Sequence, residues 1–183
     1  MGRVRPVAKQ QVAFLRAVNV GKRRVEMAKL RTELEGLGFD DVWTYINSGN
    51  AVFRSPLGRT KLEPQIEDLL ESSFGFVVET FVRTAAQVAE IVDRAPFGAV
   101  PDGVTHMVAL LRSAPSAADR KAIEALSGPV DELQVHGAEV HWRIEGKSLD
   151  TQLKPKDWKA AGAGLNTTRN ITMLTKLTAK LGS

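Results

Sequence analysis

Apolar positions in the first half of the chain switch between the period of a strand and that of a helix. Residues 12–18 are almost continuously apolar, a pattern typical of a strand buried on both faces. Apolar residues then recur at helical spacing and stop before Gly38, which can supply a left-handed cap. The pattern therefore predicts a central strand followed by a helix over 26–37.

Two short segments rich in β-branched and aromatic residues predict a hairpin with strands at 42–46 and 50–54. The loop Asn47-Ser48-Gly49 joins them and places glycine where φ is positive. Pairing Ile46 with Asn50 predicts that one face of the hairpin carries Trp43, Tyr45, Ala51 and Phe53.

A helix over 62–74 and a strand over 76–82 complete the order strand, helix, strand, strand, helix, strand. This is the split βαβ, or ferredoxin-like, order, which places both helices on one face of a four-stranded antiparallel sheet. The second half varies the same order, with helices near 84–93 and 116–126 and strands at 104–111, 130–135 and 138–144. We therefore expect an α+β fold of two ferredoxin-like halves, residues 1–83 and 84–183, with helices packed on antiparallel sheets.

The hairpin of the second half has a tight turn predicted at His136-Gly137. One face of this hairpin is apolar, with Leu133, Val135, Ala138, Val140 and Trp142. The other face is expected to be half exposed and carries Gln134, Glu139, His141 and Arg143.

Composition places the chain among ordinary globular proteins, with 43% hydrophobic and 25% charged residues. The absence of cysteine excludes disulfides, thiolate nucleophiles and cysteine-ligated metals, and it suits a reducing cytosol. No secretory signal and no apolar segment of about 18 residues is present, so a cytoplasmic protein without a membrane span is expected. The net charge of +4 favours a mild attraction to phosphates.

The closing helix is expected to open at Thr167-Thr168-Arg169-Asn170, with Thr168 as its cap and a first turn that lacks a carboxylate. Free backbone N–H groups, two hydroxyls and a guanidinium are the ingredients of a phosphate or carboxylate pocket. An ordinary threonine cap beside a solvent-facing arginine explains the same residues. Both interpretations stay open at this point.

Polar residues also interrupt the first strand and the hairpin of the second half. Arg16 lies within the apolar strand, where a guanidinium needs a carboxylate partner, a route to solvent or a ligand, and Asn19 follows it. Gly146-Lys147-Ser148 resembles the end of a P-loop, but His141 stands where that motif needs glycine. Lys147 and Ser148 are left as candidates for a looser anion site or for helix capping.

No metal site or cofactor is predicted, because His106, His136 and His141 have no metal-ligand spacing. No catalytic triad is predicted either, because Ser48 lacks the flanking glycines of a nucleophile elbow.

Three stretches, 14–21, 45–53 and 167–170, with the segment 146–149 as a fourth, resemble the signature segments of the domain-of-unknown-function 1697 family in the same order. The resemblance implies a mostly bacterial, cytoplasmic α/β protein of two ferredoxin-like halves, with no established activity. It also implies two departures: Ala17 stands where the family usually has glycine, and Ile171 where a tryptophan commonly follows Arg-Asn.

If the family pattern reflects one site, its polar residues are expected to meet in space: Arg16, Asn19, Asn47, Ser48, Asn50, Thr168, Arg169 and Asn170. The first functional hypothesis is the binding of a phosphate-bearing ligand, a nucleotide or RNA, with Trp43, Tyr45 and Phe53 as a stacking face if exposed. The second is an enzyme acting on a small anionic metabolite, in which arginines clamp the substrate. The third is a protein interaction module. The sequence does not indicate an oligomeric state.

Overall fold

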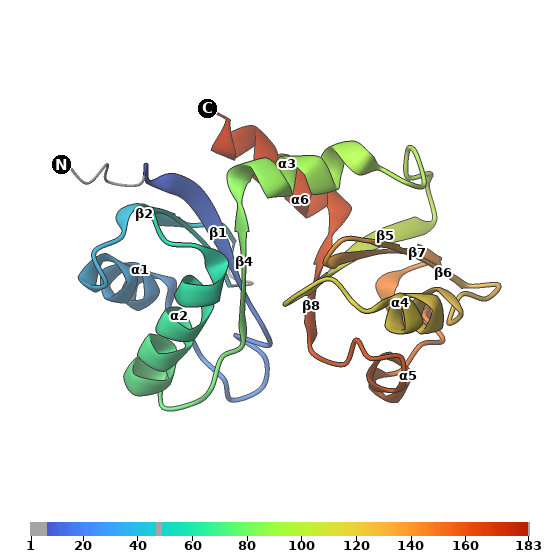
Figure 1. Ribbon diagram of the computed structural model, residues 1–183, viewed down its shortest axis with the longest axis horizontal. Helices are drawn as coiled ribbons and strands as arrows, with labels where there is room; N and C mark the ends of the chain where they lie inside the picture. Colours follow the sequence, from blue (N-terminus) through green and yellow to red (C-terminus); the bar gives the residue numbers. More distant parts are fainter. Residues whose placement is uncertain (1–6, 47–48, 183) are drawn as a thin grey trace. The chain divides into compact units, whose positions relative to one another are not determined.

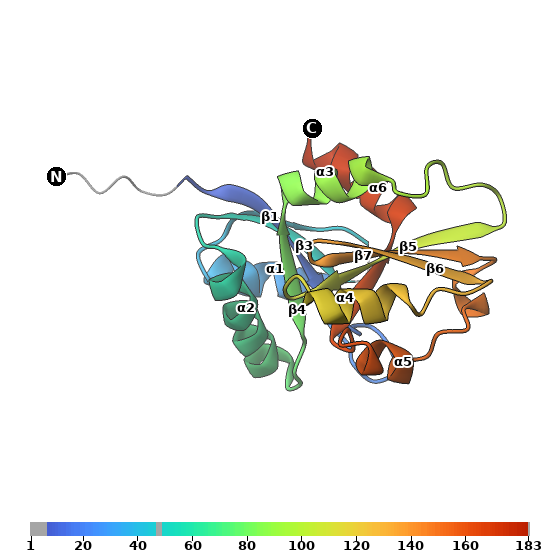
Figure 2. The ribbon, with the colours of Figure 1, turned by 45° about the vertical axis from the view of Figure 1, so that its right-hand side comes forward.

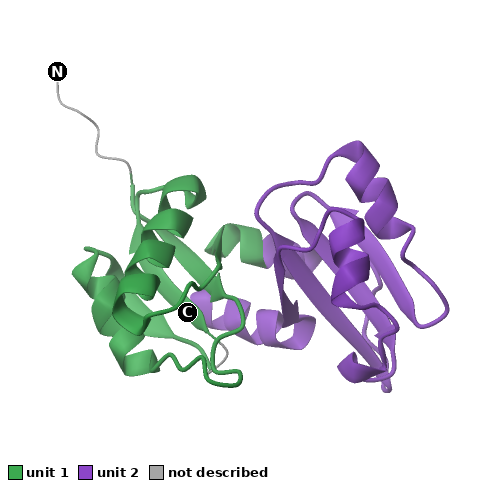
Figure 3. Cartoon of the chain, turned by 90° about the horizontal axis from the view of Figure 1, so that it is seen from below, with its two compact units in different colours: residues 1–88 green, residues 89–183 purple. Residues whose placement is uncertain are grey.

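The computed structural model describes residues 7–46 and 49–182. The chain divides into two compact units, Met1–Val88 and Ala89–Ser183 (Figure 3). Helix α3 (Ala85–Arg94) begins in unit 1 and ends in unit 2. The division into folding domains at residues 83 and 84 stays a prediction.

Unit 1 follows the predicted order of elements: β1 (Lys9–Leu15), α1 (Met27–Gly36), β2 (Asp40–Thr44), β3 (Asn50–Ser55), α2 (Arg59–Phe74) and β4 (Thr80–Thr84). Its four strands form an antiparallel sheet in the order β2-β3-β1-β4, which is the ferredoxin-like order. Both helices cover the same face of this sheet (Figure 1). The fold prediction for the first half is confirmed.

The core of unit 1 lies between this face and the two helices. The helices contribute residues at the helical spacing seen in the sequence, Leu30 and Leu34 from α1 and Leu62, Ile66 and Leu70 from α2. The sheet contributes Ala13, Leu15, Ala51, Phe53 and Val82. β1 is a central strand, and all its residues from Val12 to Leu15 are buried, as its continuous apolar run predicts.

The pairing predicted for the first hairpin is wrong by one residue. Trp43 lies opposite Val52 and Thr44 opposite Ala51, with an irregularity between Asp40 and Trp43. A shift of one residue moves a side chain to the other face of the sheet. Trp43 therefore lies on the face opposite to Phe53.

Unit 2 repeats the order after α3: β5 (Val104–Leu111), α4 (Ala117–Glu124), β6 (Asp131–His136), β7 (Glu139–Glu145), the 3-10 turn η1 (Ser148–Asp150), α5 (Pro155–Ala160), β8 (Asn166–Asn170) and α6 (Ile171–Leu181). The sheet order β6-β7-β5-β8 is again ferredoxin-like. Helices α4 and α5 cover one face of this sheet, and α6 packs against β5 and β8 on the other (Figure 2).

The apolar face predicted for the second hairpin forms the core of unit 2. Leu133 pairs with Trp142 and Val135 with Val140, and the ring of Trp142 meets that of Trp158 from α5 at 5.2 Å. The predicted turn is displaced by one residue: His136 pairs with Glu139 at the ends of the strands, so the turn residues are 137 and 138.

Strand register reveals a structural repeat that the sequence does not show. Ala13 of β1 lies opposite Ala51 and Val82, and Ala109 of β5 lies opposite Val140 and Thr168. In both units the amide of the leucine two residues further on donates to the hairpin turn, from Leu15 to Gly49 O and from Leu111 to Ala138 O, each at 2.8 Å. The two units therefore share register as well as topology.

The same register makes Arg83 of β4 the counterpart of Arg169 of β8. Both residues are buried, and each donates from Nη1 to the carbonyl of the residue before it, Val82 at 2.9 Å and Thr168 at 2.8 Å. A helix begins two residues later in both units.

Within the described ranges 7–46 and 49–182, the longest and most apolar helices fall short of what is needed to cross a membrane.

Candidate functional site

The loop after β1 is a closed, preformed structure. Ala17, Asn19 and Gly21 all have positive φ, at 51°, 57° and 59°. The Asn19 side chain accepts from the amide of Val25 at 3.0 Å and donates to the carbonyl of the same residue at 3.3 Å. Its backbone N–H donates to Arg23 O at 2.7 Å. The role of Asn19 that the structure shows is therefore to close this loop on itself.

The turn of the first hairpin packs against the start of the same loop. Gly49 has φ +77°, and a Cβ built there would lie 2.4 Å from Val18 Cγ2 and 2.9 Å from Leu15 Cβ. Only glycine fits this position, both for its conformation and for its space. Buried Asn50 donates from its side chain to Tyr45 O at 3.0 Å, which closes the turn. Segment 14–21 and the described turn residues 49 and 50 thus meet in unit 1.

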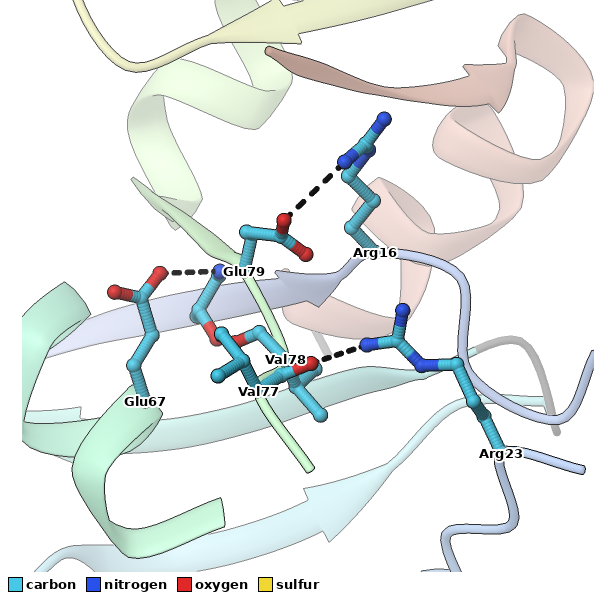
Figure 4. A network of polar contacts seen from close by, with 7 residues as sticks. Arg16, Arg23, Glu67, Val77, Val78 and Glu79 are labelled. Carbon is cyan, nitrogen blue, oxygen red and sulfur yellow. Dashed lines mark hydrogen bonds and ion pairs between the residues drawn. The ribbon is translucent and has the colours of Figure 1, made fainter. Parts of the chain in front are cut away.

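Arg16 follows β1 instead of lying inside it, so the predicted placement within a buried strand is wrong. Its Nη1 lies 3.3 Å from Glu79 Oε1, and both side chains are partly exposed (Figure 4). The backbone N–H of Arg16 also donates to Glu79 O at 2.9 Å. The second carboxylate oxygen of Glu79 is buried and has no hydrogen-bond partner among the described residues.

Three cationic residues, Lys22, Arg23 and Arg24, follow one another in the loop. Arg23 is anchored, because its Nη2 donates to Val77 O and its guanidinium lies 5.1 Å from the centre of the Phe76 ring (Figure 4). Lys22 and Arg24 are exposed and have no ion pair or side-chain hydrogen bond within residues 7–46 and 49–182. Two cations of this loop therefore remain available to an anion from solution.

A hollow of about 510 Å³ opens beside Arg24. The start of α1 adds partial positive charge to the wall of this hollow. The side chain of the N-cap residue, Glu26, makes no capping hydrogen bond to the first amides of the helix, and the first turn contains no acidic residue. The Glu26 carboxylate is the one acidic group on its wall, which is made of Asn19, Arg24, Val25, Glu26, Met27 and Ala28.

In unit 2 the structure corrects the predicted start and cap of the closing helix. Residues 166–170 form strand β8, paired with β5, and the cap of α6 is Asn170, whose side chain accepts from Thr172 N at 2.8 Å. Thr168 is not the cap, because it lies opposite Ala109 in the middle of the edge strand β8. Arg169 is buried and donates to Thr167 Oγ1 at 2.9 Å, and burial lowers its pKa to about 10, so it stays charged at neutral pH.

The family model for a protein of unknown function, DUF1697, matches residues 8–141 of this sequence. The chain belongs to the DUF1697 family. The match covers segments 14–21 and 45–50, which form the loop and the turn described above in unit 1.

A solved structure with the same fold as this DUF1697 chain is that of the conserved bacterial protein SP0830 from Streptococcus pneumoniae. The TM-score is 0.74 at 21% sequence identity, over 96% of this chain and 99% of that one. No curated protein matches the sequence.

The remaining candidate site residues are Lys147, Ser148, Asn47 and Ser48. Lys147 and Ser148 are exposed at η1, and Ser148 does not cap it; the turn is held by Asp150, whose carboxylate accepts from Lys147 N at 2.7 Å. Asn47 and Ser48 lie outside the described residues. The predicted site joins residues of unit 1 with residues of unit 2, and its convergence stays a prediction.

The condition set for a stacking face at Trp43, Tyr45 and Phe53, that the face is exposed, is not met. Phe53 is fully buried and its ring stacks on Phe39 at 4.4 Å in the core of unit 1. Trp43 lies on the opposite face and is only half exposed, as is Tyr45. These three aromatic side chains do not form one exposed platform.

Sequence reasoning also missed a buried pair of histidines in unit 2. His141 was expected on a half-exposed face, but it is completely buried and lies 3.0 Å from His106, from Nδ1 to Nε2. Alternation along one strand cannot reveal this contact, because it depends on a second strand and on what covers both. Within the described parts of the chain, no group of three or more metal-ligating residues could hold a metal ion.

Proposed function

We propose that unit 1 binds a phosphate-bearing ligand, a nucleotide or RNA, through the loop that joins β1 to α1. The observation that carries the proposal is the run Lys22-Arg23-Arg24 on a loop closed by Asn19, with Lys22 and Arg24 exposed and without carboxylate partners among the described residues. Cations held on a preformed loop lose little conformational entropy when they bind an anion. No anion pocket at α6 is part of this proposal.

The hollow beside Arg24 supports a ligand larger than a free phosphate. Its volume of about 510 Å³ falls within the usual range for small-molecule sites, about 300–1,000 Å³. A phosphate near Arg24 and the first amides of α1 would meet both a guanidinium and the positive end of a helix. The rest of a nucleotide would then extend over the wall formed by Val25 and Met27.

The absence of cysteine and the mild positive charge suit a bacterial cytoplasmic protein that meets nucleotides and RNA. We therefore propose that the protein acts in the cytoplasm.

The test compares two double variants that remove the same charge. Lys22→Gln/Arg24→Gln takes two cations from the loop, and Lys156→Gln/Lys159→Gln takes two exposed cations from α5 in unit 2. Binding of ATP, inorganic phosphate and a single-stranded RNA of about eight nucleotides is measured by calorimetry at about 50 and about 200 mM salt. We expect affinity to fall at least about tenfold in the loop variant and to change little in the α5 variant.

The three probes separate the ligand classes. A nucleotide site is expected to bind ATP better than phosphate, whereas an RNA site is expected to bind the oligonucleotide with a steep salt dependence. Equal losses in the two double variants would show a response to net charge alone. That result, or no binding to any probe, would contradict the proposal.

A second candidate, an enzyme acting on a small anionic metabolite, is favoured by one observation. Glu79 lies 3.3 Å from Arg16 and keeps one buried carboxylate oxygen without a partner among the described residues, so this oxygen can accept a proton from a substrate within reach (Figure 4). The test is turnover of phosphorylated metabolites followed by phosphorus NMR. Turnover that is lost in Glu79→Gln while binding persists would favour the enzyme, and absence of turnover would favour the binding module.

A further inference from the structure

Two buried histidines on neighbouring strands of unit 2 form a hydrogen-bonded pair, and the ring of His136 meets that of His141 edge to face, with 5.6 Å between centroids. His106 of β5 is 2% exposed and His141 of β7 is 0% exposed, and they are diagonal neighbours on the same face of the sheet. The distance of 3.0 Å between His106 Nε2 and His141 Nδ1 requires a proton on only one of the two nitrogens. Nε2 of His141 is buried without a hydrogen-bond partner in the described part of the chain.

The surroundings keep this pair neutral. Burial lowers the pKa of His106 to about 4, and burial, followed by the charges of His106, His136 and Arg94, lowers the pKa of His141 to about 3. The pKa of His136 is lowered as well, by burial and by Arg94 and Arg120, against the opposing effect of Glu124 and Glu139. Beside the pair in the sheet, Arg143 lies opposite His106 and is bonded to Glu145, and buried Arg169 lies opposite Val108.

The loop 95–103, between α3 and β5, supplies the other neighbour of His106. The ring of Phe97 meets the His106 ring edge to face, with 5.1 Å between centroids. Phe97 is half-buried, whereas every residue from 98 to 103 is exposed. Two backbone hydrogen bonds of the loop are local, Gly98 N to Ala95 O and Val104 N to Pro101 O, and a third ties its last residue to the segment after β7, because Gly146 N donates to Gly103 O at 2.8 Å. The contact of Phe97 with His106 therefore holds the first part of this loop, whereas the hydrogen bond to Gly103 holds its end.

We propose that loop 95–103 is an acid-opened flap, held shut by the packing of Phe97 on the neutral His106–His141 pair. A protonated imidazole needs water or a counter-ion, and the groups outside the pair whose charge acts on His141, His136 and Arg94, are cationic when charged. Moving Phe97 away hydrates His106 while the sheet stays intact. Because hydration restores the ordinary affinity of the imidazole for a proton, acid shifts the equilibrium toward the open flap.

The flap would make access to this face of unit 2 dependent on pH in the range just below neutral. The proposal is independent of phosphate binding, which involves the loop after β1 in unit 1. A negative result for phosphate binding therefore leaves the flap proposal untouched, and a negative result for the flap leaves the binding proposal untouched.

Phe97 offers a selective probe, because it is the only phenylalanine in unit 2. In protein labelled with fluorophenylalanine, fluorine NMR between pH 7 and 4.5 reports Phe97, and the remaining signals report unit 1. We expect the ratio of open to closed flap to rise about tenfold for each pH unit below 6.5, since opening takes up one proton. The fluorescence of Trp142 and Trp158, which touch in the core of unit 2, is expected to stay constant over this range.

Two variants decide the cause. His106→Gln/His141→Gln keeps a hydrogen-bonded pair without a titrating group, and its Phe97 signal is expected not to move with pH. His136→Gln removes the third titrating ring, which meets His141, but leaves the His106–His141 hydrogen bond in place, so the Phe97 signal is still expected to move with pH. A Phe97 signal that is constant in the wild type, a response that persists in the glutamine pair or one that is lost in His136→Gln would overturn the proposal.

Phe97→Ala tests the flap even if the double variant does not fold, because it leaves both histidines in place. Hydrogen exchange at Gly98 and Val104 is then expected to be faster than in the wild type at pH 7. Unchanged exchange at these two amides in Phe97→Ala would also overturn the proposal. So would a tryptophan fluorescence of the wild type that changes with pH in parallel with the Phe97 signal, because it would show unfolding of the core of unit 2.

Discussion

Ala17 occupies a backbone conformation that suits glycine. Its φ of 51° lies in the left-handed region, where the Cβ of an L-residue crowds the neighbouring carbonyl. This explains the glycine that the family resemblance implies at this position. The conformation persists because Asn19 and the turn at Gly49 hold the loop on either side.

Replacing Ala17 by glycine is therefore expected to stabilise unit 1 by about 1 kcal/mol. The free energy of unfolding of unit 1 is measured by urea unfolding, with hydrogen exchange of the amides of unit 1 as the readout. The control is Ala28→Gly, in the first turn of α1, which is expected to destabilise by up to about 1 kcal/mol because glycine is a poor helix former. A loss of stability in Ala17→Gly would contradict the account of the strain.

At the scale of elements, helix α2 protects the free edge of the unit 1 sheet. β4 is an edge strand, and its outward amides at Thr80 and Val82 donate to Glu67 Oε1 at 2.7 Å and to Glu63 Oε1 at 2.9 Å. Glu63 is only 4% exposed, so its hydrogen bond is shielded from water. Side chains of α2 thus replace the missing neighbour strand.

We expect Glu63→Ala to destabilise unit 1 by about 2–3 kcal/mol, because the buried amide of Val82 loses a charged acceptor. The matched variant Glu63→Gln keeps an oxygen at the same place and is expected to cost less. Urea unfolding of both variants measures the difference. Equal stability of Glu63→Ala and the wild type would refute the role of this carboxylate.

At the scale of the whole molecule, the two units repeat one topology but bury different polar groups. Unit 1 shields carboxylates at its sheet edge, whereas unit 2 holds a neutral histidine pair. Carboxylates titrate mainly below pH 5, and unfolded histidines titrate near 6.5. Mild acid is therefore expected to act first on unit 2.

The stability of unit 2 is expected to fall as the pH drops below 6.5. The folded pKa values of His106 and His141, about 4 and about 3, lie below those of the unfolded chain, so the unfolded state binds more protons in this window. The loss is on the order of 1 kcal/mol per pH unit for each histidine while the flap is closed, and flap opening reduces the share of His106 because the open folded state also binds a proton. Urea unfolding at pH 7 and pH 5.5 measures it, with His106→Gln/His141→Gln as the variant expected to show a much smaller change.

The sequence allowed much of the fold to be predicted, and less of the site. The positions and types of most elements follow from the period of apolar residues, since a buried face of a helix or strand leaves its mark locally. Strand β8 was missed because Asn-Thr-Thr-Arg-Asn has no apolar face and reads as a helix cap. It is a strand because its backbone pairs with β5, far away in the sequence.

By itself, the sequence determined the two α+β halves, the central place of β1, the helix faces that enter each core and the glycine at residue 49. These depend on local periodicity and backbone conformation. The tertiary structure alone decided that Asn19 closes a loop, that Arg169 is buried in a strand and that His106 meets His141. Such contacts join segments that are distant in the sequence, and their energy depends on burial and hydrogen-bond geometry that no local pattern encodes.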